Sequence, residues 1–74
     1  ASNPVYQFLQ EHAHKYGFVI SYPAGKQHLT GYTYEPWHIR YIGVELATEL
    51  FNRNYQSSTN SEYLTKFLIE KGMY

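Results

Sequence analysis

The sequence contains no cysteine, so no disulfide bond can reinforce this chain of 74 residues. An excess of charge of either sign is also absent, because six lysine and arginine residues balance six aspartate and glutamate residues. Composition therefore gives no reason to expect a nucleic-acid partner or an anionic membrane surface. No apolar run is long enough to cross a bilayer, and no stretch has the form of a secretion signal. These absences leave one small domain, of a size that buries only about 60% of its unfolded surface.

Residues 1–17 are expected to form a helix. Asn3 is a good N-cap, Pro4 suits the first turn, and Gly17 suits a left-handed residue that ends a helix. Helical spacing also places apolar residues on one stripe, namely Val5, Phe8, Leu9, Ala13 and Tyr16.

The middle of the chain predicts a small antiparallel sheet. Residues 18–23 are rich in strand-forming types and end at a proline, and residues 24–26 have turn chemistry. Residues 27–34 form either a second strand or an irregular loop. The clearest strand is 37–42, in which Trp37, Ile39 and Tyr41 lie on one face while His38 and Arg40 lie on the other.

Two helices follow the sheet in this prediction. Residues 44–53 form the first, with Ala47, Leu50 and Phe51 toward the core. Residues 59–62, Thr-Asn-Ser-Glu, have the form of a capping box that opens the last helix, whose inward residues would be Tyr63, Leu64, Phe67 and Leu68, and Gly72 ends it. The expected class is α+β, with an N-terminal helix, a small antiparallel sheet and two C-terminal helices.

Glu35 and His38 are the candidate pair for chemistry, as a general base and a metal ligand. Positions three apart in a regular strand face opposite ways and lie roughly 10 Å apart. Pro36 breaks that regularity, because it fixes its own φ and lacks an N–H, so Glu35 can sit on a bent approach to the strand that carries His38. The structural alternative is a surface glutamate, a half-buried histidine and an aromatic core residue at Trp37.

The remaining histidines do not form a ligand set. His12 and His14 are two apart on a helix, where side chains do not face each other, and His28 is expected to be solvated. Arg40 has two interpretations: it pairs with an acidic side chain to hold the strand, which we favour, or it meets a substrate carboxylate.

A longer resemblance surrounds the candidate pair. The stretch 35–41, Glu-Pro-Trp-His-x-Arg-Tyr, resembles the C-terminal signature of the VanY-type D-alanyl-D-alanine carboxypeptidases, bacterial zinc peptidases related to L,D-carboxypeptidases and VanX-type dipeptidases. The approach to it is similar as well, in residues 11–18, 22–26 and 30–34, so that the resemblance covers about residues 5 to 70.

The resemblance implies a zinc ion held by three side chains, with His38 as one ligand and Glu35 as the base. It also implies that Trp37, Tyr34 and Arg40 bind substrate, although Trp37 and Tyr34 could equally pack. The family's two other ligands belong to an upstream motif, Ser-x-His-x-x-Gly-x-Ala-x-Asp, which these residues do not contain. We therefore expect residues 1–74 to be the C-terminal portion of a single catalytic domain with a partial peptidase fold.

The expected activity of the whole domain is removal of the terminal D-alanine from peptidoglycan stem peptides, in the bacterial cell envelope or as a secreted enzyme. An L,D-carboxypeptidase and a non-catalytic peptidoglycan-binding fragment stay open as alternatives. The chain alone is expected to be inactive for lack of ligands. Aromatic residues make up 19% of it, and some of them should be exposed when the rest of the domain, or a second copy of the chain, does not cover them.

Overall fold

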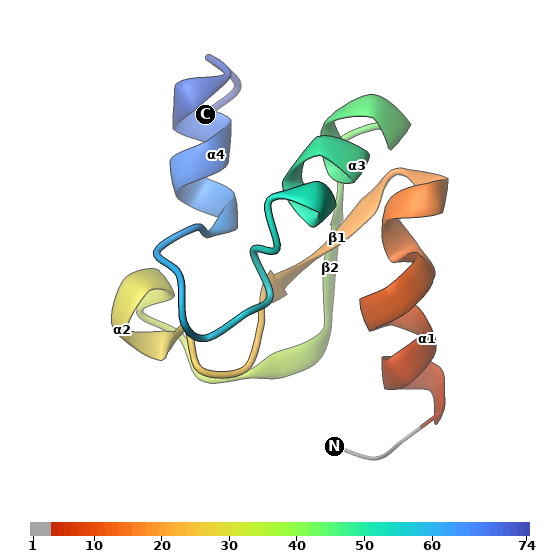
Figure 1. Cartoon of the computed structure of the whole chain (residues 1–74), viewed down its shortest axis with the longest axis vertical. Helices are drawn as coiled ribbons and strands as arrows, with labels where there is room; N and C mark the ends of the chain where they lie inside the picture. The colour runs from red at the N-terminus through yellow and green to blue at the C-terminus, as the bar shows by residue number, and fades with distance from the viewer. Residues whose placement is uncertain (1–3) are drawn as a thin grey trace.

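The computed structural model describes residues 4–74 and has the α+β architecture expected (Figure 1). Asn3, the expected N-cap, lies outside these residues. The elements in chain order are α1 (Pro4–His12), the 3-10 helix η1 (Ala13–Tyr16), β1 (Phe18–Tyr22), α2 (Gln27–Thr30), β2 (Glu35–Tyr41), α3 (Val44–Asn52) and α4 (Leu64–Glu70).

The single helix predicted for residues 1–17 is divided into α1 and η1, and η1 ends at Gly17 as the sequence predicts. Gly17 has φ 88°, and its N–H donates to the carbonyl of His14 at 3.0 Å. A Cβ at this position would lie 2.6 Å from a ring carbon of Tyr41 and 3.1 Å from the carbonyl carbon of Gly43. Glycine is therefore needed twice here, once for the backbone conformation and once for the close approach of the chain that follows β2.

The apolar stripe predicted for this helix is mostly exposed. Ala13 is buried, but Val5, Phe8 and Tyr16 are 62%, 50% and 62% exposed. The reason is geometric: two strands form too narrow a sheet to cover the N-terminal turns of α1, so burial is confined to the end of the stripe where η1 meets the sheet and α3.

The two strands pair antiparallel with an irregular register. Ile20 lies opposite Ile39 and Tyr22 lies opposite Glu35, so one residue of β1 but three residues of β2 lie between these two pairs. Position 36 falls in this interval, where the sequence analysis expected proline to interrupt the strand. The shift is a bulge-type irregularity, which bends a strand and re-aims its side chains.

The hydrophobic core lies between one face of this sheet and the two C-terminal helices. It is made of side chains from β1, the chain after β2, α3, the following loop and α4, namely Val19, Ile42, Ala47, Leu50, Tyr55, Leu64, Phe67 and Leu68. Helix α1 contacts the sheet as well, and in Figure 1 it lies on the other side of the hairpin from α4. Among residues 4–74, none of the helices is long and apolar enough to cross a membrane.

A buried lysine connects the middle of the chain to its C-terminal third. Lys26 has no exposed surface, and its Nζ donates to the carbonyl of Asn60 at 2.6 Å, to Oδ1 of Asn60 at 2.7 Å and to the carbonyl of Glu62 at 2.9 Å. The Lys26 carbonyl in turn accepts from the N–H groups of Leu29 and Thr30. Residues 27–30 are consequently a helical turn, neither the strand nor the irregular loop expected for them.

The same lysine explains why the last helix does not begin at the predicted capping box. Oδ1 of Asn60 accepts from both Lys26 Nζ and the N–H of Glu62, and Tyr63 stays extended at φ −157° and ψ 164°. Helix α4 therefore starts at Leu64 and has no side-chain cap. Of its predicted inward residues, Leu64, Phe67 and Leu68 are buried, whereas Tyr63 precedes the helix and is half-buried. Gly72 follows the end of α4 with φ 70°.

Candidate functional site

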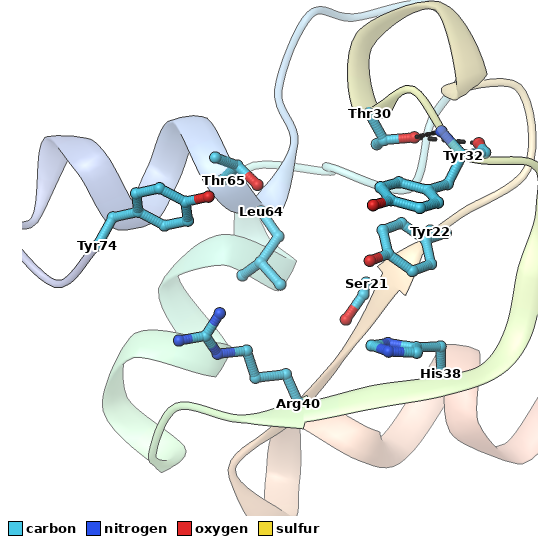
Figure 2. A pocket seen from close by; sticks show the side chains of 9 residues that line it. All are labelled: Ser21, Tyr22, Thr30, Tyr32, His38, Arg40, Leu64, Thr65 and Tyr74. Carbon is cyan, nitrogen blue, oxygen red and sulfur yellow. Dashed lines mark hydrogen bonds between the residues drawn. The ribbon is translucent and has the colours of Figure 1, made fainter.

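A cavity of about 200 Å³ opens between the strand pair and α4 (Figure 2). Leu64, which belongs to the core, forms part of its wall, so the cavity is an open end of the core. The complete lining is Ser21, Tyr22, Thr30, Tyr32, His38, Arg40, Leu64, Thr65 and Tyr74. Two residues that the sequence predicted to share a face, His38 and Arg40, are both in this wall, as strand alternation requires.

Three aromatic rings form one side of the cavity. The ring of Tyr22 lies 4.8 Å from the imidazole of His38 and 4.5 Å from the ring of Tyr32, measured between centroids. Tyr22 therefore stands between the other two rings and limits how the exposed imidazole can turn. Among the described residues, none hydrogen-bonds to the His38 ring through an interaction that would fix its tautomer.

Arg40 supplies the cation of the cavity wall. Its guanidinium makes no ion pair with any acidic side chain of residues 4–74, although four other basic or histidine side chains do so or lie near one, namely His12, Arg53, Lys66 and Lys71. The ion-pair interpretation of Arg40 therefore has no partner within the described chain. Its planar fork is exposed beside the cavity, where it can take a carboxylate.

The structure separates the other predicted site residues from this cavity. Glu35 is half-buried at the start of β2 and does not line it. The Tyr34 hydroxyl accepts from Nε2 of Gln10 at 3.3 Å, and Trp37, 61% exposed, has its ring 6.5 Å from that of Tyr6. Tyr34 and Trp37 thus contact α1, on the side of the sheet away from α4.

Sequence reasoning missed Ser21 and Tyr22. Ser21 is 5% exposed, lines the cavity, and its Oγ has no hydrogen-bond partner. The available signal was a small polar residue in an otherwise apolar strand, at a position that shares a face with Val19. Tyr22 could not have been found that way, because the register shift turns its side chain toward His38.

The other histidines lie elsewhere, as expected. His28 is exposed, and His14 stacks on Phe51 with ring centroids 3.6 Å apart. Burial lowers the pKa of His14, and the nearby charges of Lys15 and His12 lower it further.

The described residues do not form a complete zinc site. Within residues 4–74, no three histidine, aspartate or glutamate side chains converge to hold a metal ion. One imidazole, His38, does not make a tetrahedral site, because such a site needs three or four protein groups. The described chain by itself does not fit the ion.

Comparison with known proteins gives concordant matches. The family model for VanY, D-alanyl-D-alanine carboxypeptidase, matches residues 1–44. A D-alanyl-D-alanine carboxypeptidase of Enterococcus faecalis is 43% identical over 51 residues, which are 69% of this chain and 19% of that protein. The chain spans about a fifth of the length of the curated relatives it matches.

Solved structures agree with the sequence match. The LdcB LD-carboxypeptidase has a TM-score of 0.69 and 42% identity, with coverage of 72% of this chain and 25% of the other. VanYB in complex with D-alanine-D-alanine has a TM-score of 0.68 and 41% identity, with coverage of 73% and 30%. These matches confirm the predicted fold class and the resemblance read from residues 35–41. The chain belongs to the VanY family of D-alanyl-D-alanine carboxypeptidases.

Proposed function

We propose that this chain is the C-terminal portion of a zinc-dependent carboxypeptidase domain that removes the terminal D-alanine from peptidoglycan stem peptides. The observation that carries the proposal is the Glu35–His38 stretch at an irregularity of β2, which presents His38 and Arg40 together in one cavity wall. Similarity to VanYB, solved in complex with D-alanine-D-alanine, supports the same substrate class.

Each predicted residue has a role in this proposal. His38, as a neutral imidazole, gives one of the zinc ligands, and the others come from outside the described residues. When bound, zinc supplies an acidified water and polarises the scissile carbonyl. Glu35 accepts a proton during hydrolysis and returns it to the leaving D-alanine amine.

The predicted substrate-binding residues lie on opposite faces of β2, and only Arg40 borders the cavity. Arg40 offers its planar fork to a peptide carboxylate on the cavity side. Trp37 and Tyr34 form a wall on the α1 side, where Trp37 is largely exposed. The exposed aromatic surface of that side packs against the rest of the catalytic domain or, in its absence, against a second copy of the chain. The site of action is the cell envelope or the secreted fraction.

A second candidate is an L,D-carboxypeptidase, which the similarity to LdcB favours as much as the similarity to VanYB favours the first. A third, a fragment that binds peptidoglycan without cleaving it, applies to the isolated chain. The isolated chain is inactive on this proposal, since a single imidazole cannot hold zinc tightly.

The test uses the longer carboxypeptidase that carries this chain together with the upstream zinc motif. Glu35→Gln keeps size and hydrogen bonding, so zinc content should stay and D-alanine release from a muramyl pentapeptide should fall at least ~10²-fold. His38→Ala should lose zinc first and activity in consequence. Glu45→Gln and His28→Ala, at exposed positions, are the matched controls. A tetrapeptide assayed beside the pentapeptide separates L,D from D,D activity.

A further inference from the structure

Ser21 carries a buried hydroxyl without a partner, at the wall of the cavity. Only 5% of its surface is exposed, and its Oγ makes no hydrogen bond within the described chain. Leaving such a group unpaired costs free energy, so proteins rarely do so away from places where a ligand or water completes the bond. Only one other buried side-chain atom of residues 4–74 shares this state, Nδ1 of His14.

Unlike Ser21, the buried polar groups of Lys26 and Tyr55 have hydrogen-bond partners within the chain. The ammonium of Lys26 has three oxygen acceptors, and the hydroxyl of Tyr55 bonds twice to the backbone of Ile20. Both of these groups are therefore satisfied within the chain. Ser21, one position along β1 from Ile20, is left with an unpaired hydroxyl in the cavity wall that also contains His38 and Arg40 (Figure 2).

The surroundings of the hydroxyl select the kind of group it can meet. The cavity wall contains one permanently charged side chain, Arg40, and the hydroxyls of Thr30, Thr65 and three tyrosines, but no carboxylate. A cation and several hydrogen-bond donors with no anion favour a negatively charged ligand group. A volume of about 200 Å³ is below the usual range for drug-sized ligands, so it suits one or two small residues.

We propose that Ser21 is a substrate-binding residue, whose hydroxyl donates a hydrogen bond to a peptide carboxylate that pairs with Arg40. This inference deepens the proposed function and rests on it for the identity of the peptide. The ligand class is a short peptide with small side chains and a free terminal carboxylate. Tyr22 contributes indirectly: its ring packs on His38 and closes the side of the cavity.

The binding test needs neither zinc nor turnover. The 74-residue chain, labelled with ¹⁵N, is titrated with acetyl-D-alanyl-D-alanine and, separately, with the same peptide as its C-terminal amide. We expect the acid to shift the resonances of the Ser21 and Thr65 amides and of the Arg40 Nε–H, and the amide to bind at least ~10-fold more weakly, because a charge-assisted hydrogen bond is lost.

Variants assign the effect to the hydroxyl. Ser21→Ala should weaken binding of the acid about 10-fold, Ser21→Thr should recover part of it, and Ser61→Ala, at an exposed serine, should change nothing. Thermal unfolding distinguishes a binding role from a structural role, because a structural role of the hydroxyl predicts a lower Tm for Ser21→Ala. Removing an unpaired buried hydroxyl should leave Tm unchanged or raise it, as is common where function is kept at a cost in stability.

The same variants in the longer carboxypeptidase distinguish failure of this proposal from failure of the proposed function. There, Ser21→Ala should raise KM and leave zinc content unchanged. Normal D-alanine release with an unaltered KM would overturn the role of Ser21 and leave the activity standing. Conversely, Ser21-dependent binding in a protein that releases no D-alanine would support the subsite and overturn the activity. A lower Tm for Ser21→Ala, with binding of the acid unchanged, would identify Ser21 as structural.

Discussion

The hydroxyl of Tyr55 holds both backbone groups of Ile20. It accepts from the Ile20 N–H at 2.8 Å and donates to the Ile20 carbonyl at 3.1 Å, and burial raises its pKa well above the usual range. Ile20 lies opposite Ile39 in the sheet, so Tyr55 replaces a neighbouring strand on the other edge of β1. One side chain of the loop after α3 thereby fixes the strand segment that presents Ser21 to the cavity.

Tyr55→Phe should destabilise the fold through these two backbone groups. The substitution keeps the ring but leaves an N–H and a carbonyl buried without partners, at about 1–3 kcal/mol for each group left unpaired. A loss of that size lowers the Tm of a small domain by at least ~4 °C. Thermal unfolding measures it, with Tyr16→Phe as the control, because Tyr16 is 62% exposed. Equal Tm values for the two variants would contradict the role of this hydroxyl.

Local sequence signals located most of the elements and the common face of His38 and Arg40. Gly17 ends the first helix by its backbone preference, and alternation along residues 37–41 separates the two faces of β2. Both signals depend on a residue and its near neighbours only, which is why a single sequence contains them.

The remainder depended on contacts between distant residues. Lys26 meets Asn60 and Glu62, and this pairing creates α2 and delays α4 beyond the predicted capping box. Pro36 indicated where β2 is irregular, but the register of the two strands depends on their pairing and could not be predicted from either strand alone. The lack of a hydrogen-bond partner for Ser21 Oγ, and its position in the cavity wall, depend on the three-dimensional structure.

Arg53 joins three acidic side chains from three parts of the C-terminal half. Its guanidinium lies 2.9 Å from Glu49, 3.1 Å from Glu62 and 2.7 Å from Glu70, and it covers the ring of Phe67. Arg53→Gln should therefore lower Tm, and the loss should shrink as salt is raised to about 1 M, because screening already weakens the wild-type pairs there.

The control for this network is Lys66→Gln, which removes a single pair with Glu62 at an exposed position. Its Tm should change less than that of Arg53→Gln at low salt. Similar shifts for the two variants would show that Arg53 acts as an ordinary surface charge and that the threefold pairing adds little.

His14 should make stability depend on pH near neutrality. Its pKa is lowered in the folded chain, first by burial and then by Lys15 and His12, so the unfolded chain binds more protons as pH falls below about 6.5. Stability is therefore highest above that pH and decreases on acidification until the folded-state pKa is passed. Glu49 and Glu70 do not produce this change, because their pKa values are lowered from an already acidic range.

Urea unfolding between pH 5 and 8 measures the effect of His14. His14→Phe keeps an aromatic ring for the stack on Phe51 and removes the titrating group, so its stability should vary less over this range than that of the wild type. His28→Gln, at an exposed position, should retain the wild-type dependence. An unchanged slope in His14→Phe would assign the pH dependence to other groups.

The α1 side of the sheet should make the isolated chain self-associate. Phe8, Trp37 and Tyr41 are 50%, 61% and 64% exposed, and large exposed apolar surface is typical of an interaction site. Sedimentation should show a mass that rises with concentration, and Trp37→Ser should reduce the rise. A monomer over the whole concentration range, with a stable thermal transition, would argue against coverage of this side by further chain.

Zinc binding tests the division of the site between this chain and the rest of the domain. His38 is the one predicted ligand, and no cluster of three ligating side chains exists within residues 4–74. The isolated chain should therefore bind zinc weakly, since a tetrahedral site needs three or four protein groups and partial sets lose most of the affinity. Calorimetric titration measures this, with His38→Ala as the comparison. Submicromolar binding at one zinc per chain, lost in His38→Ala, would place a complete site in this polypeptide and refute the division. Binding at one zinc per two chains, increasing with protein concentration, would instead indicate that two His38 side chains share an ion across a dimer. In that dimer, Ser21 and Arg40 of both copies would lie near the same metal.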